Sequence, residues 1–238
     1  MAIPNPHQIY QSSTKTLYDY LDQGNQTGIY IPPFQRSYSW GRDNIERLFE
    51  DIIQGLQNLK SRPNTLTFLG TILAVDDTTN RFVYPVMQGE LPDKVLSVVD
   101  GQQRLATMLM TNITLHDRIR RLVKSLADTS DPCIEWLTRQ GQTVLGNLEG
   151  TFIIRRNTGD ESTSLYPRMI RAHDDTWSTK GGEKYSSPIA RLIKEYSEYY
   201  KGDASPTLGG EFRYKGEDSD NRVIEEHQFL VSAFRIIQ

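Results

Sequence analysis

The chain has 238 residues, with 37% hydrophobic and 24% charged side chains and a formal net charge of −3. This composition is that of a soluble globular protein and excludes fibrous and low-complexity chains. The weak net charge gives no overall nucleic-acid signature, so any contact with DNA must come from local basic side chains. Cys133 is the single cysteine, which excludes an internal disulfide. With neither a signal-like N-terminus nor a span of bilayer length, we expect a cytoplasmic protein that does not associate with membranes.

The first half of the chain predicts helices around an extended segment, followed by strands. Residues 9–21 predict a first helix, and Asp43 with Glu46 has the spacing of a capping box that begins a second. That second helix carries an apolar stripe formed by Ile45, Leu48, Phe49, Ile52, Ile53, Leu56 and Leu59. Residues 66–75, 81–87 and 95–99 predict strands. A long amphipathic helix follows, from residue 102 to residue 126.

The second half is less regular. After a break at residues 128–132, a strand is expected at residues 152–156 and a helix at residues 189–200. Residues 201–221 predict a flexible surface loop, and residues 222–238 a final helix. Because the chain stops inside this apolar helix, we expect it to be a fragment of a longer protein.

The junction between the strand at 95–99 and the long helix is the most informative feature. There Asp100 and Gly101 form a turn that is followed by Gln102, Gln103 and Arg104. A helix begins with unpaired N–H groups and a partial positive charge, so a phosphate would find donors after Gly101. Arg104 can add a charge-assisted contact, and Asp100 can hold a metal ion or a water. The alternative is that Asp100 and Gly101 simply cap the helix.

A second unusual segment spans residues 29–40. Two prolines make it extended and rigid, so that its side chains are held in place at little entropic cost. Its aromatics, interleaved with a glutamine and an arginine, can stack a base or line a pocket. The alternative is an edge segment that buries Phe34 and Trp40 against the core. The residues concerned are Tyr30, Pro32, Pro33, Phe34, Gln35, Arg36, Tyr38 and Trp40.

Several familiar chemistries lack their sequence signatures. There is no Walker A motif and no dinucleotide-binding glycine fingerprint. The histidines, His7, His116, His173 and His227, are too far apart along the chain to form a readable zinc or HNH site. We expect His116, on the long helix, to be a packed histidine rather than a catalyst.

Together, the two motifs resemble the N-terminal, GmrS-like domain of the GmrSD-type modification-dependent restriction endonucleases. This group includes anti-phage effectors that sense phosphorothioate DNA. The match consists of residues 31–40 (IPPFQRSYSW) and residues 99–105 (VDGQQRL), in the order found in the family. The resemblance covers residues 9–127.

The resemblance implies an α+β fold, with a ParB/sulfiredoxin-like nucleotide-binding core at residues 1–127 and a mixed, mainly helical extension at residues 128–238. DNA cutting would belong to a C-terminal HNH domain outside this chain. The resemblance further implies a nucleoside triphosphatase that uses Mg²⁺, with GTP as the expected nucleotide and modified DNA as a partner. A homodimer is compatible with it.

The family's site residues carry over onto the two motifs. Catalytic roles would fall to Asp100, Gln102, Gln103 and Arg104, with Asp100 also as the metal ligand. Nucleotide binding would involve Gly101, Gln35 and Arg36. DNA sensing would involve Tyr30, Pro32, Pro33, Phe34, Tyr38 and Trp40.

Two hypotheses of different class follow. The first is an enzyme that hydrolyses a nucleoside triphosphate, is coupled to sensing of phosphorothioate or cytosine-modified DNA, and regulates a nuclease. The second is a non-catalytic module that binds modified DNA and uses the nucleotide only as an allosteric ligand.

Overall fold

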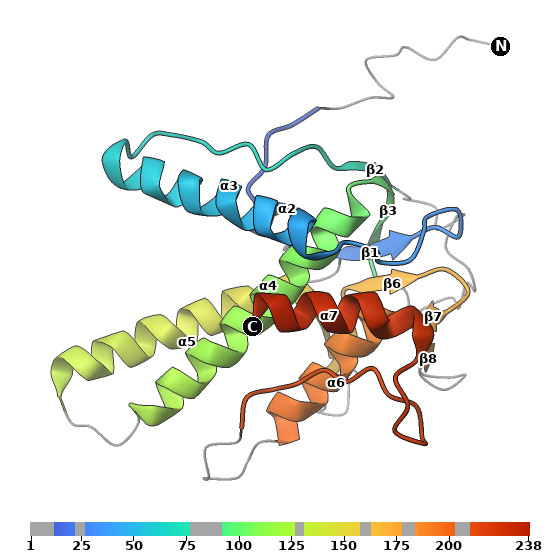
Figure 1. The fold of residues 1–238 in the computed structure, drawn as a ribbon. Coiled ribbons are helices and arrows are strands. Elements are labelled where there is room, and N and C mark those ends of the chain that lie inside the picture. The colour runs from blue at the N-terminus through green and yellow to red at the C-terminus, as the bar shows by residue number, and fades with distance from the viewer. Residues whose placement is uncertain are drawn as a thin grey trace.

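A four-stranded mixed sheet lies to one side of the long helices, at the right in Figure 1. The computed structural model describes residues 12–21, 27–76, 92–126, 131–157, 163–177, 184–202 and 210–238. The sheet has the order β2-β3-β1-β6, formed by Leu73–Asp76, Lys94–Asp100, Thr27–Ile31 and Met169–Arg171. β1 pairs in parallel with both β3 and β6, whereas β2 is antiparallel to β3. The carboxyl ends of β1, β3 and β6 therefore point to the same edge of the sheet.

The two central strands are buried on both faces, as their apolar sequences require. All five residues of β1 and residues 95–98 of β3 are buried. One face packs against a large apolar cluster that includes Ile29 and Val98, and the other against a smaller cluster around Tyr30 and Trp177. The strands thus hold the edge where they end in a fixed position.

Helices cover the sheet and surround the long helix α4 (Gln102–Ser125). α5 (Pro132–Phe152) lies beside α4 as the second arm of a helical hairpin, and α6 (Pro188–Gly202) and α7 (Gln228–Ile237) pack against α4 as well (Figure 1). The other helices of the described residues are α2 (Leu17–Leu21), α3 (Arg42–Ser61) and the 3-10 helix η1 (Glu225–His227). Two small hairpins complete the fold, β4 (Ile153–Asn157) with β5 (Thr163–Pro167), and β7 (Asp175–Thr176) with β8 (Lys184–Tyr185).

Most of the expected elements are present, and several differ in their bounds. The strand at 95–99 and the helices beginning near 43, 102 and 189 are confirmed. The final helix, expected at 222–238, begins only at Gln228, after the 3-10 helix η1. The capping box is wrong, because Gly41 is the N-cap of α3 and no side chain caps it. Residues 66–72 form no strand, since β2 begins at Leu73, and the strand expected at 81–87 lies outside the described residues. In the first expected helix, residues 12–16 are not helical, and residues 9–11 lie outside the described residues.

Two features of the second half were not expected from the sequence. α5 occupies a stretch for which no helix was predicted. The surface loop predicted at 201–221 is wrong at Phe212 and Tyr214, because both side chains are buried in the main apolar cluster.

The fold is a mixed arrangement of helices and strands, consistent with the α+β class. The ParB/sulfiredoxin-like core and the division at residue 127 stay predictions. β6 belongs to the central sheet, and the main apolar cluster runs from Leu21 to Phe234, so the packing crosses residue 127. Among the described helices, none is both long enough and apolar enough to cross a membrane.

Candidate functional site

The two sequence motifs lie side by side where the parallel strands of the sheet end. The aromatic segment follows β1, and the Asp100-Gly101 turn follows β3, which is the parallel neighbour of β1. β6 ends at Arg171 on the other side of β1. Ligands of open parallel sheets bind outside the carboxyl ends of the strands, so this edge is the candidate site.

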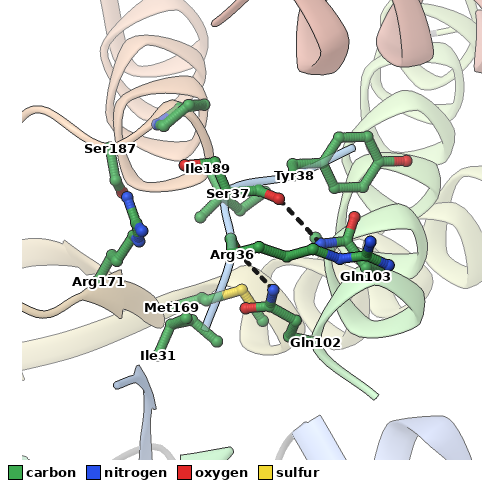
Figure 2. A pocket seen from close by; sticks show the side chains of 12 residues that line it. Ile31, Arg36, Ser37, Tyr38, Gln102, Gln103, Met169, Arg171, Ser187 and Ile189 are labelled. Carbon is green, nitrogen blue, oxygen red and sulfur yellow. Dashed lines mark hydrogen bonds between the residues drawn. The ribbon is translucent and has the colours of Figure 1, made fainter. Parts of the chain in front are cut away.

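Gln102 and Gln103 hold the aromatic segment against the start of α4 (Figure 2). The Gln102 amide nitrogen donates to the carbonyl oxygen of Arg36 at 2.5 Å, and that of Gln103 to the carbonyl oxygen of Ser37 at 3.1 Å. The Gln103 amide oxygen accepts from the backbone N–H of Ser39 at 2.8 Å. Both glutamines are buried. We call these contacts the glutamine clamp and residues 35–39 the clamped segment.

Three further hydrogen bonds reinforce the clamp. The side-chain amide of Gln35 donates to the carbonyl oxygen of Val99 at 2.6 Å, at the end of β3. The hydroxyls of Tyr38 and Thr107 lie 2.8 Å apart, and Thr107 also donates to the carbonyl oxygen of Gln103 at 2.9 Å. Burial raises the pKa of Tyr38 to about 12, so this phenol stays neutral. The clamped segment and the turn therefore form one unit.

The turn after β3 leaves the first amides of α4 without a hydrogen-bond acceptor among the described residues. Gly101 is the N-cap with a φ of +89°, and no side chain caps the helix. Among the described residues, no acceptor bonds the backbone N–H groups of Gln102, Gln103 or Arg104, and Leu105 is the first to bond, to Gly101. A Cβ on Gly101 would lie 3.1 Å from the carbonyl oxygen of Thr71. The glycine is therefore required both by its φ and by the neighbouring chain.

Arg104 faces away from the clamped segment, towards the chain that leads into β2. Its Nη1 donates to the carbonyl oxygen of Thr71 at 3.2 Å. The guanidinium lies over Gly70, where a Cβ would come within 2.5 Å of its central carbon. Asp100, the last residue of β3, is exposed and pairs in register with Leu73 of β2. Sequence reasoning missed Gly70 and Thr71, although a glycine just before a strand is a usable signal.

A pocket opens on the opposite side of the turn, between the clamped segment and the start of α6 (Figure 2). Its apolar lining consists of Ile31, Ala106, Met169, Pro188 and Ile189. Its polar lining includes Arg36, Ser37, Arg171 and Ser187 in addition to the clamp residues. Arg104 is not part of this lining, whereas Gln102 and Gln103 are. The side chains of the motif therefore lie on two sides of the turn.

Asp175 ties two walls of the pocket together. Its carboxylate accepts from the backbone N–H of Arg171 at 2.7 Å, and from the N–H and hydroxyl of Ser187 at 2.8 and 2.5 Å. Burial raises the pKa of Asp175 to about 6, although these hydrogen bonds oppose the increase. Arg171, Asp175 and Ser187 were not identified from the sequence, because no local motif connects them.

The residues predicted to sense DNA differ in exposure. Tyr30, Pro32 and Tyr38 are buried, and the half-buried Trp40 packs against the main apolar cluster. Pro33 is exposed, and Phe34 is 71% exposed. Among the residues predicted to sense DNA, Pro33 and Phe34 are therefore the ones that a large ligand can reach without unfolding the segment.

The potential metal ligands are sparse. Within the described residues, no group of three or more His, Cys, Asp or Glu side chains is placed to hold a metal ion. Asp100 could thus contribute a single carboxylate. This is compatible with Mg²⁺, which keeps several waters and is often bound through one or two carboxylates plus substrate phosphates. His116 is buried beside Tyr196, as expected of a packed histidine.

Comparison with known proteins extends the resemblance seen in the motifs. No curated protein matches the chain. The model of the GmrSD restriction endonuclease N-terminal domain matches residues 17–238, which is nearly the whole chain. The chain therefore belongs to the GmrSD restriction endonucleases, a family of restriction-type anti-phage defence, as an N-terminal domain.

Proposed function

We propose that this domain binds and hydrolyses a nucleoside triphosphate and couples hydrolysis to recognition of modified DNA. The observation that carries the proposal is the glutamine clamp, which joins the Asp100–Arg104 turn to the aromatic segment at the carboxyl edge of the sheet. A ligand at either motif is thereby connected to the other through direct hydrogen bonds. The modification is phosphorothioate or modified cytosine, and GTP is the expected nucleotide.

The turn has the groups needed to hold a triphosphate. The amides of Gln102, Gln103 and Arg104, which have no acceptor in the described part of the chain, lie at the positive end of α4 and favour phosphate oxygens. Arg104 donates one hydrogen bond to the Thr71 carbonyl, and its other N–H groups can make a charge-assisted contact with a phosphate. Asp100 is exposed at the same turn, where it can orient the attacking water. Mg²⁺, bound through Asp100 and the phosphates, would neutralise charge that develops on them.

DNA recognition is assigned to the surface of the aromatic segment. Pro33 and Phe34 are exposed and lie beside the clamped segment. A DNA strand that shifts this surface would strain the hydrogen bonds from Gln102 and Gln103, and so change the start of α4. The coupling is reciprocal, because a nucleotide that stabilises the turn must favour the same clamped arrangement. In this scheme both glutamines are positioning residues.

A second candidate function is a binding module in which the nucleotide is only an allosteric ligand. It is favoured by the occupancy of the glutamine side chains, which are both buried and bonded to backbone groups of the clamped segment. Gln103 engages both its amide nitrogen and its amide oxygen in this way, so that oxygen cannot also orient a water without weakening the clamp. The remaining chemistry at the turn would rest on Asp100 and Arg104.

Phosphate release from each of the four nucleoside triphosphates, with Mg²⁺ and with or without modified DNA, tests the proposal. We expect turnover that rises with modified DNA. In Arg104→Ala, nucleotide affinity should fall by about 2 kcal/mol, or roughly 30-fold, because a charge-assisted contact is lost. Arg139→Ala, at an exposed arginine of α5, is the matched control and should behave as wild type.

The outcomes separate the two functions. Wild-type protein that releases no phosphate under any condition but binds modified DNA would support the binding module and contradict hydrolysis. Turnover that persists unchanged in Arg104→Ala would exclude the turn as the catalytic site.

A further inference from the structure

The charged side chains that line the pocket between the clamped segment and α6 are cationic. Among the described residues, its lining includes Arg36 and Arg171 and no Asp or Glu, although Asp174 pairs with Arg171 from outside the lining. The start of α6, with Ser187, Pro188 and Ile189, forms one wall, and the 15-residue helix adds the partial positive charge of its N-terminus. Figure 2 shows the Arg36 side chain extending towards Gln103, and the Arg171 side chain lying beside Ser187. Two arginines and a helix N-terminus in the lining of one cavity favour an anionic ligand.

Arg171 is held in place yet keeps free donors. Its Nη2 donates to the carbonyl oxygen of Gln35 at 3.1 Å, and its Nη1 pairs with Asp174 at 3.0 Å. Its Nε is buried and has no acceptor among the described residues. Because a guanidinium carries five N–H groups, two such bonds leave donors for a ligand. Preorganised donors of this kind lose little freedom on binding.

Arg36 is the second cation of the pocket, and its side chain is not engaged elsewhere. Its carbonyl oxygen takes part in the glutamine clamp, which fixes the backbone at this position. The side chain is exposed and makes no hydrogen bond or ion pair with any described residue. It can therefore turn towards an anion without breaking an existing contact.

The rest of the lining restricts the class of anion. Ile31, Met169 and Ile189 are apolar and face the same cavity (Figure 2). A bare inorganic anion would leave this surface uncovered, whereas a phosphate ester can place its organic part there. Asp175 fixes the two walls relative to each other through Arg171 and Ser187. The cavity is thus shaped by buried contacts rather than by mobile side chains.

We infer that this pocket is a phosphate-ester site, with Arg171 and Arg36 as its binding residues and Met169 and Ile189 as the surface for the organic part of the ligand. The inference rests on the proposed function in placing a phosphate-bearing ligand at this edge of the sheet. It goes beyond that function in assigning a phosphate-ester group to the β6 side of the turn, in a pocket whose lining does not include Arg104. A nucleotide and the DNA backbone are the two sources of such a group.

Calorimetric titration of the whole chain at low ionic strength tests the inference and separates these sources. The probes are inorganic phosphate, a non-hydrolysable GTP analogue and a short DNA duplex. Arg36→Met and Arg171→Met should each weaken binding of the analogue or of the duplex by about tenfold or more, with inorganic phosphate the weakest probe. Arg191→Met, at a half-buried arginine of α6 that pairs with Glu195, should bind as wild type.

A variant that is expected to strengthen binding distinguishes a ligand-binding role of Arg171 from a structural one. Asp174→Asn removes the carboxylate that competes for the Arg171 guanidinium, so it should tighten binding about threefold or more. A purely structural Arg171 would instead give weaker binding in Asp174→Asn. Thermal melting of each variant shows whether it is folded. If Arg171→Met unfolds, Arg36→Met still tests the pocket, because the Arg36 side chain is exposed.

The results also separate this inference from the proposed function. If Arg104→Ala abolishes nucleotide binding while Arg36→Met and Arg171→Met bind both organic probes as wild type, the pocket assignment is overturned and the proposed function survives. If no phosphate is released but binding depends on Arg171 and tightens in Asp174→Asn, the pocket stands and hydrolysis does not.

Discussion

At the scale of single residues, the buried ionisable groups Asp175 and His116 respond to pH in opposite directions. Burial raises the pKa of Asp175 from 3.8 to about 6 and lowers that of His116 from 6.5 to about 4. The folded state therefore binds a proton at Asp175 more tightly than the unfolded chain does, and one at His116 less tightly. Asp175 contributes stability that is lost as pH rises from about 4 to about 6, whereas His116 contributes stability that is lost as pH falls from about 6.5 to about 4.

Substitution of Asp175 by Asn should expose this difference. Between pH 4 and pH 7, wild type should lose up to about 3 kcal/mol of unfolding free energy relative to Asp175→Asn. The reason is that only wild type must ionise a buried carboxyl over this range. His116→Gln is the control. The unfolding free energy of wild type relative to this variant should increase with pH. Urea denaturation at a series of pH values measures both. Differences that do not vary with pH would contradict the assigned environments.

At the scale of elements, the junction of β3 and α4 depends on its glycine. In Gly101→Ala, the φ of +89° and the 3.1 Å approach of a Cβ to Thr71 should lower the free energy of unfolding by about 1–2 kcal/mol. Gly146→Ala is the matched control, because Gly146 lies inside α5 with nothing within 4 Å of the Cβ position. It should stabilise the protein by about 0.5–1 kcal/mol. Urea denaturation of both variants would contradict this account if the two shifts had the same sign.

The elements that could be predicted from the sequence are those determined by local pattern. β3 has a run of apolar residues, α4 has helical periodicity, and the turn between them has an Asp-Gly pair. α5 escaped prediction because its apolar residues do not form a buried stripe, and Trp136, Leu137 and Val144 are exposed. Phe212 and Tyr214 lie in a polar stretch whose composition indicated a loop, but their rings are buried in the main apolar cluster.

The site could be predicted only in part for the same reason. Both motifs were identified, and they do lie together. The partners of their side chains are set by tertiary structure, since Gln102 and Gln103 bond backbone groups 66 residues away along the chain. Arg171 and Ser187 join the site because β6 pairs with β1 and α6 starts beside it. No spacing rule in a single sequence encodes that strand order.

At the scale of the whole molecule, the packing joins the two ends of the chain. Phe234 of α7 is buried in the same cluster as Leu21 and Ile29, and its ring lies 5.9 Å from that of Phe212. α7 contacts both α3 and α4. The core that supports the turn at Gly101 therefore includes residues from the last helix. We expect the described parts of the chain to unfold together.

Truncation of Phe234 tests this expectation. Phe234→Ala should destabilise the protein by about 3–5 kcal/mol, because a buried ring is replaced by a cavity. Phe229→Ala, on the same helix, is the matched control and should have little effect, since Phe229 is 56% exposed. Unfolding is followed by far-ultraviolet circular dichroism and by tryptophan fluorescence, which reports on Trp40, Trp136 and Trp177. If the molecule is one cooperative unit, both signals show a single transition that shifts equally in Phe234→Ala. If residues 1–127 fold independently, one transition keeps its wild-type midpoint while another moves, and the coupling of α7 to the site is excluded.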